Sequence, residues 1–277
     1  MPILAQTVPL QFDTVYSPYP AAGWREAFGD VARHGLTGIE LAVAYPKEVD
    51  GAAVVTEAER RGLTVTTLST GQICGLDGQF LTALDPGARQ RASATVLEHI
   101  RLSAKIGRPH VTIGLIRGGF DEDSGTEELL AAALRPLCQA AANEGVSLQI
   151  EPINRGEVSL LTNVWQTVAF IRGMGNPPGL GILYDTYHSD LEDGDPLAAA
   201  RAALPYLTNV HLADRGRLLP GEGGIDFGAL SESLLAAGYQ GTFALEAKCL
   251  PTREHVLARY GESLRAAVAG GDAKRAD

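Results

Sequence analysis

The sequence predicts an α/β fold, a closed (β/α)8 TIM barrel that forms a single domain. Short runs rich in β-branched and apolar residues recur eight times, and segments with helical spacing of apolar residues separate them. Eight such repeats in 277 residues suit a closed parallel barrel better than an open sheet, because no glycine-rich dinucleotide turn follows the first run. The catalytic barrel domain is expected at 1–269, and the end GGDAKRAD (270–277) is expected to be a flexible tail.

The strands are predicted from runs of alternating or continuous apolar residues bounded by turn-forming residues. They are expected at 9–15, 37–43, 64–69, 110–116, 147–151, 180–185, 208–213 and 242–247. A helix is predicted over 85–107, where Asp85 can cap the first turn and Pro86 suits the first helical position. A second helix is predicted over 127–144, and Pro136 is expected to kink or split it.

Composition and charge limit the partners that the protein can have. Acidic residues outnumber basic ones by 33 to 23, and the formal charge of -10 disfavours binding to nucleic acids and anionic lipids. Three cysteines without a CxxC pair suggest neither a disulfide framework nor a thiolate zinc site. The chain shows no signal-peptide pattern and no apolar run of roughly 18 residues. We therefore expect a cytoplasmic protein that binds neither nucleic acid nor membrane.

Each of the last four predicted strands ends in a potential metal ligand. Their apolar residues share one face, while the opposite face carries small or polar residues and, near the end, Glu151, Asp185, His211 or Glu246. The C-terminal ends of barrel strands build the active site, so these four side chains are expected to converge. Three carboxylates and an imidazole suit Mn²⁺, Mg²⁺ or Co²⁺ better than structural zinc. The alternative is four unrelated polar residues, each with its own partners.

Four segments of the sequence resemble a known family. They read IEPINRGE (150–157), YDTYHSD (184–190), HLADRGRLLPGEGGIDF (211–227) and ALEAK (244–248). Over almost its whole length the chain resembles the xylose-isomerase-like superfamily of sugar isomerases and epimerases. The likeness is strongest to the ketose 3-epimerase branch, which includes D-tagatose and D-psicose 3-epimerases.

The resemblance implies both a cofactor and roles for individual residues. It implies a divalent metal, Mn²⁺ before Co²⁺ or Mg²⁺, held by Glu151, Asp185, His211 and Glu246. The two glutamates would also be the catalytic acid/base pair. The substrate contacts that the resemblance implies are Glu157, His188 and Arg217.

The activity that the resemblance implies is the isomerisation or epimerisation of a small sugar. Ketose 3-epimerisation by enediolate proton transfer between the two glutamates is the first expectation. Hydroxypyruvate isomerases and inosose dehydratases use similar barrels, so these activities stay open. Barrels of this kind often pair through outer helices or loops, and a homo-oligomer is therefore possible.

The main rival is an apurinic-site endonuclease of the endonuclease IV type, which holds three zinc ions with additional histidines. The expected histidines are absent from STGQ (69–72) and from IGLIRGG (113–119), and the expected Asp-x-His reads Asp226-Phe227-Gly228. A trinuclear site is incomplete without them. A non-catalytic binding barrel would be expected to have lost one of the four ligands, and none is lost.

Two further residues are secondary candidates. Arg117, followed by Gly118 and Gly119, could contact a phosphate group after the fourth strand. Glu40 lies on the small and polar face of the second strand, where it could support the ligands or be a buried structural carboxylate.

Overall fold

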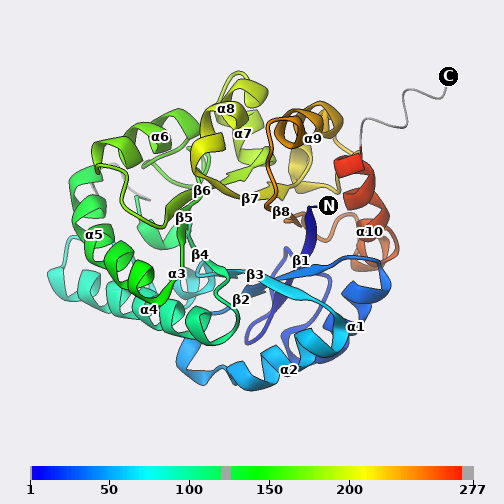
Figure 1. The fold of residues 1–277 in the computed structure, drawn as a ribbon, viewed down its shortest axis with the longest axis horizontal. Coiled ribbons are helices and arrows are strands. Elements are labelled where there is room, and N and C mark those ends of the chain that lie inside the picture. Colours follow the sequence, from blue (N-terminus) through cyan, green and yellow to red (C-terminus); the bar gives the residue numbers. More distant parts are fainter. Residues whose placement is uncertain (1, 120–125, 270–277) are drawn as a thin grey trace.

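The computed structural model describes residues 2–119 and 126–269, which form a closed, parallel eight-stranded barrel ringed by helices (Figure 1). The strands pair in chain order, and the last strand pairs with the first. They are β1 (Ile3–Pro9), β2 (Gly38–Ala42), β3 (Thr64–Ser69), β4 (His110–Ile113), β5 (Leu148–Ile150), β6 (Leu180–Asp185), β7 (Leu207–Leu212) and β8 (Thr242–Leu245). The predicted (β/α)8 barrel is therefore confirmed.

Helices follow the strands and cover the outside of the barrel (Figure 1). They are α1 (Trp24–Arg33), α2 (Gly51–Arg61), α3 (Gln72–Asp77), α4 (Pro86–Lys105), α5 (Glu127–Glu144), α6 (Val164–Gly173), α7 (Thr186–Glu192), α8 (Pro196–Ala203), α9 (Phe227–Ala236) and α10 (Arg253–Ala269). Many begin at a side chain that accepts a hydrogen bond from the first turn, as Asp85 does for α4. No helix in the described ranges is long and apolar enough to cross a membrane.

The barrel interior carries a polar network below the candidate site. The Asn209 amide on β7 donates to Thr67 Oγ1 on β3 at 3.1 Å and to Glu40 Oε2 on β2 at 3.3 Å. These strands are not neighbours in the barrel, so the hydrogen bonds cross its interior. Gln149 on β5 bonds Thr112 on the neighbouring β4 at 2.9 Å and Thr208 on β7, which is not a neighbour, at 2.7 Å. All of these side chains are buried or half-buried and paired, as burial of polar groups requires.

The first strand lies earlier in the chain than predicted. The run 9–15 is wrong as a strand: Ile3–Pro9 pairs with β2 and β8, and the chain leaves the barrel after Pro9. The Gln11 side chain instead bonds the backbone of Tyr45 through both its oxygen and its nitrogen, which holds 10–15 as a loop. Pro9 has no N–H to donate, so it suits the end of a strand.

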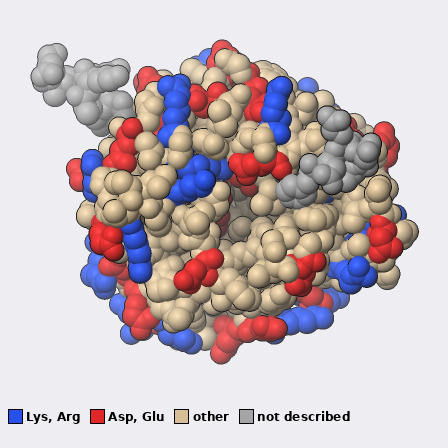
Figure 2. All heavy atoms as spheres, turned by 180° about the vertical axis from the view of Figure 1, so that it is seen from behind, with Lys and Arg blue, Asp and Glu red and all other residues tan. Residues whose placement is uncertain are grey.

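Other departures from the predicted elements are smaller. Helix α5 runs unbroken from Glu127 to Glu144 with Pro136 inside it, so the predicted split is wrong. Strands β4 and β8 end before the predicted boundaries at 116 and 247. The predicted tail at 270–277 lies outside the described residues. On the face drawn in Figure 2, acidic and basic side chains are interspersed around a central hollow.

Candidate metal centre and active site

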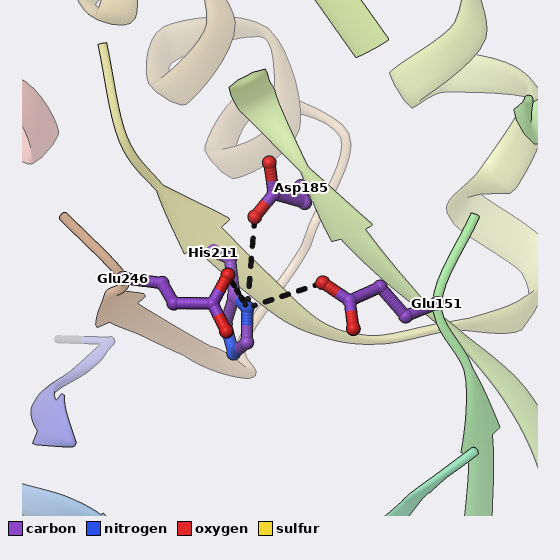
Figure 3. Close-up of side chains that lie close together, drawn as sticks. All are labelled: Glu151, Asp185, His211 and Glu246. Atoms are coloured by element: carbon purple, nitrogen blue, oxygen red, sulfur yellow. Dashed lines mark ion pairs between the residues drawn. The ribbon is translucent and has the colours of Figure 1, made fainter. Parts of the chain in front are cut away.

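The four candidate ligands meet at the C-terminal ends of β5 to β8, as Figure 3 shows. Glu151 and Glu246 each follow directly after a strand, and their backbone N–H groups still bond the neighbouring strand at Ile113 O and Leu212 O. Asp185 ends β6, and His211 lies within β7. One ligand atom from each of the four side chains lies within 4.8 Å of the others. The four side chains expected to converge therefore form one group.

The His211 ring is oriented as a metal ligand would be. Its Nε2 lies 3.0 Å from Glu40 Oε2, so the ring proton is donated to that carboxylate. Its buried Nδ1 has no hydrogen-bond partner among the described residues. That nitrogen faces Glu151 Oε1 at 3.7 Å, Asp185 Oδ2 at 3.7 Å and Glu246 Oε2 at 3.3 Å. A carboxylate behind a histidine typically fixes the tautomer and orientation of a metal ligand, and Glu40 occupies that position.

The charges of the four candidate ligands favour the binding of a cation. Burial raises the pKa of Glu246 to about 7, and nearby Glu151 adds to the rise, although His211 and Arg217 oppose it. Burial alone would lower the pKa of His211, but Glu40 and Glu246 reverse this and raise it well above its usual value. The shift of His211 shows that negative charge surrounds its ring, and the shift of Glu246 shows that its carboxylate is poorly solvated, so a divalent cation would stabilise the charged form of these carboxylates. The residues therefore fit a divalent metal with oxygen ligands and one imidazole ligand.

Gly114 lets the Glu151 carboxylate lie close to the backbone after β4. A Cβ atom at this position would lie 2.9 Å from Glu151 Oε2, closer than real Cβ contacts allow. A larger residue would therefore displace the carboxylate from this position. The sequence carries no pattern that singles out this glycine.

Arg217 lies beside two of the candidate ligands. Its Nη1 donates to Asp185 Oδ2 at 2.7 Å and to Glu246 Oε2 at 2.9 Å. Its guanidinium stacks on the Tyr187 ring at 4.5 Å and lies 5.4 Å from the Tyr16 ring. The residue is buried and has a φ of 60°, a left-handed conformation that is uncommon outside glycine. The loop after β7 thus holds this side chain in one place, at a cost in backbone strain.

Of the other two predicted substrate contacts, His188 adjoins Arg217 and Glu157 lines the same cavity. His188 Nε2 lies 2.7 Å from Arg217 Nη2, and its backbone N–H donates to Asp185 Oδ1 at 3.0 Å. Glu157 accepts a hydrogen bond from the Asn154 amide at 2.9 Å. All three predicted contacts line one cavity of ≈ 220 Å³, together with both glutamates of the ligand group.

The opposite wall of this cavity comes from the first half of the chain. It is formed by residues on or after β1 to β4, including Thr7, Tyr16, Gln72, Thr112 and Leu115. The sequence interpretation missed these residues. With β1 placed at 9–15, Thr7 fell outside a strand, and Tyr16 was not assigned to the barrel mouth.

Arg117 is not available to bind a phosphate. Its guanidinium is fully buried and donates to the backbone oxygens of Glu151, Leu160, Leu161 and Gly114. The hypothesis of a phosphate contact at this residue is therefore wrong. Arg117 instead ties the loop after β5 to the loop after β4, which supports the backbone of Glu151.

Comparisons with known proteins agree with this geometry. Residues 28–267 match the family model described as the xylose isomerase-like TIM barrel. The chain belongs to the xylose isomerase-like TIM barrel family. Among curated members, it is 30% identical over 216 residues to the L-ribulose 3-epimerase of Mesorhizobium japonicum, covering 76% of this chain and 71% of that one. It is 26% identical to the L-ribulose 3-epimerase of Methylomonas sp., covering 82% and 79% of the two chains.

A solved structure shows that the similarity extends over the whole fold. The 3-keto-D-glucoside 4-epimerase of E. coli superposes with a TM-score of 0.81 at 21% identity, covering 97% of this chain and all of that one. The predicted membership of the xylose isomerase-like TIM barrel family is thus confirmed. The named family members also support the expectation of an isomerase or epimerase that acts on a carbohydrate.

Proposed function

We propose that this chain is a divalent-metal-dependent ketose 3-epimerase with Mn²⁺ as its preferred cofactor. The observation that carries the proposal is the position of the two glutamates. Figure 3 shows Glu151 and Glu246 approaching the ligand group from opposite sides, and both line the cavity. Two carboxylates on opposite sides of a bound ketose could each serve one face of the same carbon. The epimerase names of the curated relatives support this reaction class.

The chemistry is divided between the cofactor and the residues of the cavity. A divalent cation in the group would withdraw charge from a carbonyl and an adjacent hydroxyl, which acidifies the neighbouring C–H. One glutamate then removes the C3 proton, and the other delivers a proton to the opposite face of the planar enediolate. Glu157, His188 and Arg217 would orient the sugar through its oxygens. The proposed domain is the barrel at 1–269, acting on a small sugar.

Product NMR in D₂O tests the proposed reaction. Incubation with Mn²⁺ and a set of ketoses, hydroxypyruvate and inosose should give 3-epimers that carry solvent deuterium at C3. Deuterium enters because the glutamate that delivers the proton to the opposite face has taken it from the solvent. An epimer without solvent deuterium would contradict the two-glutamate mechanism. Turnover of hydroxypyruvate or inosose alone would replace the proposed reaction with isomerisation or dehydration.

Removal of the metal tests the cofactor. Chelation should abolish activity, and Mn²⁺ or Co²⁺ should restore it, because the cation would withdraw charge from the carbonyl and acidify the neighbouring C–H. The measurement is turnover before and after dialysis against a chelator, with metal content determined in parallel. Full turnover by metal-free protein would overturn the metal assignment.

Glutamine variants separate proton transfer from metal binding. Glu151→Gln and Glu246→Gln each keep the side-chain size and one oxygen but lose the base. Turnover should fall by roughly 10² to 10⁴, the usual contribution of a positioned acid or base. Glu59→Gln, at an exposed position on α2, is the matched control and should keep normal turnover. Near-normal rates in both active-site variants would exclude the assigned roles.

A further inference from the structure

Asp214 is a buried residue in the loop after β7, and its carboxylate is bonded by backbone N–H groups. Oδ1 accepts from the N–H groups of Arg215 and Ile225, and Oδ2 accepts from that of Gly221, each at 2.9 Å. The Arg215 guanidinium pairs with Asp190 instead, and within the described part of the chain no cationic side chain forms an ion pair with Asp214. A buried carboxylate needs such hydrogen bonds, and here the loop itself supplies them.

The loop after β7 folds around this carboxylate. Gly221 and Ile225 lie 7 and 11 residues after Asp214, so their N–H groups bring distant parts of the loop to one point. At Gly223, a Cβ atom would lie 2.7 Å from Asp214 Oδ1 and 2.7 Å from the Arg215 backbone nitrogen, closer than real Cβ contacts allow. Only glycine therefore fits where the loop passes the carboxylate.

The backbone of Asp214 closes the turn that contains Arg217. The Asp214 N–H donates to the Leu218 oxygen, and the Asp214 oxygen accepts from the Arg217 N–H, both at 2.9 Å. Within this turn, Gly216 and Arg217 have φ values of 72° and 60°. A residue other than glycine keeps such a conformation only where the surrounding contacts determine it. For the Arg217 backbone, these contacts come from Asp214 and from the Lys248 N–H, which donates to the Arg217 oxygen at 2.7 Å.

We propose that Asp214 is a positioning residue, whose carboxylate holds the loop after β7 closed and thereby keeps Arg217 in place at the cavity. Among the described residues, Asp214 is not one of those that line the cavity, so it acts through Arg217, which bonds Asp185 and Glu246. A carboxylate is required because both of its oxygens accept, whereas an amide presents a donor at one of the two positions. The closure of the loop is independent of the reaction, and the effect on catalysis rests on the proposed function.

Amide hydrogen exchange, resolved for each residue by NMR, tests the closure of the loop in the full-length, Mg²⁺-loaded protein. In Asp214→Asn, the new Nδ2 group must face at least one N–H group, whichever way the amide turns. The amide of Gly221 or of Ile225, and with it that of Arg217, should therefore exchange roughly tenfold faster or more. Unchanged exchange at all three positions would overturn the proposal. Faster exchange at Gly221 or Ile225 without a change at Arg217 would show that the turn holds Arg217 without the carboxylate, which also overturns it.

Asp226→Asn is the matched control for the change of charge. Asp226 is exposed at the end of the same loop, and an asparagine can still cap α9, so the three amides should exchange as in the wild type. Faster exchange of these amides in the control would attribute the effect to charge alone and contradict the proposal. If Asp214→Asn does not fold, Gly223→Ala displaces the same carboxylate with one methyl group and should give the same pattern. Normal exchange in Gly223→Ala would then exclude the role of Asp214.

A double-mutant cycle with a ketose and Mn²⁺ measures the effect on catalysis. Asp214→Asn should raise KM by roughly 2- to 150-fold while the metal stays bound, which is the range of coupling between residues of one network. The same substitution in Arg217→Ala should change KM little, because the side chain that Asp214 positions is already absent. An equal rise of KM in both backgrounds would indicate a general structural role and would exclude the positioning of Arg217.

The results distinguish this proposal from the proposed function. If the wild type turns over no ketose, the proposed function fails, and the exchange rate of the Arg217 amide alone decides whether Asp214 holds that residue. Faster exchange at Arg217, together with a KM effect that disappears in Arg217→Ala, supports both. Faster exchange at Arg217 with unchanged KM would show that substrate binding does not depend on the closed loop, and would overturn the role of Asp214.

Discussion

At the scale of single residues, the chemistry depends on side chains that have one nitrogen or oxygen committed to the protein and another directed at the site. His211 donates from Nε2 to Glu40 and directs Nδ1 at three carboxylates. Arg217 commits Nη1 to Asp185 and Glu246. Each of these hydrogen bonds restricts the orientation of the other polar atom in the same side chain. The site is therefore organised before its ligand binds.

Glu40 is predicted to strengthen metal binding without touching the metal. Glu40→Gln leaves a weaker acceptor behind His211 and removes a negative charge near the site, so Mn²⁺ affinity should fall by roughly 10- to 100-fold. Isothermal titration with Mn²⁺ gives the affinity. Glu57→Gln is the control, because Glu57 is a buried carboxylate paired with Arg60 and Arg61 on α2. Equal affinities in the Glu40 variant and the wild type would contradict the assigned role.

Mutations of the candidate metal ligands and of the substrate contacts should have different effects. Asp185→Asn and His211→Ala each remove a candidate ligand, so metal affinity should fall. Arg217→Ala removes a substrate contact and a nearby positive charge, so KM should rise while the metal stays bound. Metal titration and steady-state kinetics on the same preparations distinguish the two effects. Metal loss from the Arg217 variant alone would reverse these roles.

At the scale of secondary-structure elements, the first and last helices are joined by a small polar cluster. The Tyr19 hydroxyl, in the loop before α1, donates to Asp30 Oδ2 on α1 at 2.6 Å. It also lies 2.9 Å from the Tyr260 hydroxyl on α10. This cluster connects the two ends of the barrel, where β1 and β8 pair. It should therefore contribute to closure of the ring.

The Asp30 cluster predicts a pH dependence of stability. Partial burial raises the pKa of Asp30, but hydrogen bonds from Tyr19 and Arg33 outweigh it and leave the pKa below its usual 3.8. A carboxyl whose pKa is lowered by folding stabilises the protein above the unfolded-state pKa, and this contribution is lost as the pH falls through the folded-state value. Asp30→Asn should cost about 1–2 kcal/mol near pH 7. Urea melts from pH 7 to pH 3 should show the difference narrowing below about pH 4. A constant difference would contradict the assignment.

The elements that sequence reasoning placed correctly are those with strong local patterns. The alternation in β6 and β7 and the capped start of α4 all come from neighbouring residues, and the structure confirms them. The strand β1 was misplaced because its pairing with β2 and β8 depends on residues far away in the sequence. The helix over 127–144 was predicted with the bounds of α5, but the expected split at Pro136 was wrong because proline propensity alone does not include the packing of that helix.

The candidate site was predicted only in part, for the same reason. Its metal ligands could be named because each ends a strand, and barrel topology brings strand ends together. Gly114 could not be found, since its importance comes from its close approach to Glu151. The site roles, the identity of the metal, the cytoplasmic location and a homo-oligomer stay predictions.

At the scale of the whole molecule, metal binding should stabilise the fold. The candidate ligands bring three carboxylates together, and a cation that binds only the folded state removes their repulsion. At free metal 100 times Kd, the gain should be about 2.7 kcal/mol. Thermal melts with and without Mn²⁺ measure it as a rise in Tm. Asp185→Asn should show a smaller rise at the same Mn²⁺ concentration, and an equal rise would place the stabilising ion elsewhere.

The two halves of the barrel contribute different residues to the cavity. This division affects how such an enzyme can change over evolutionary time. The candidate ligands all lie on or just after β5 to β8, whereas the opposite wall lies on or just after β1 to β4. Mutations in the first four loops can therefore reshape the wall without moving a ligand, apart from those at Gly114 and Arg117, which contact Glu151. An enzyme with this arrangement can evolve to accept new sugar substrates while the reaction that it catalyses stays the same. Directed evolution confined to those loops is the corresponding route to a new substrate range.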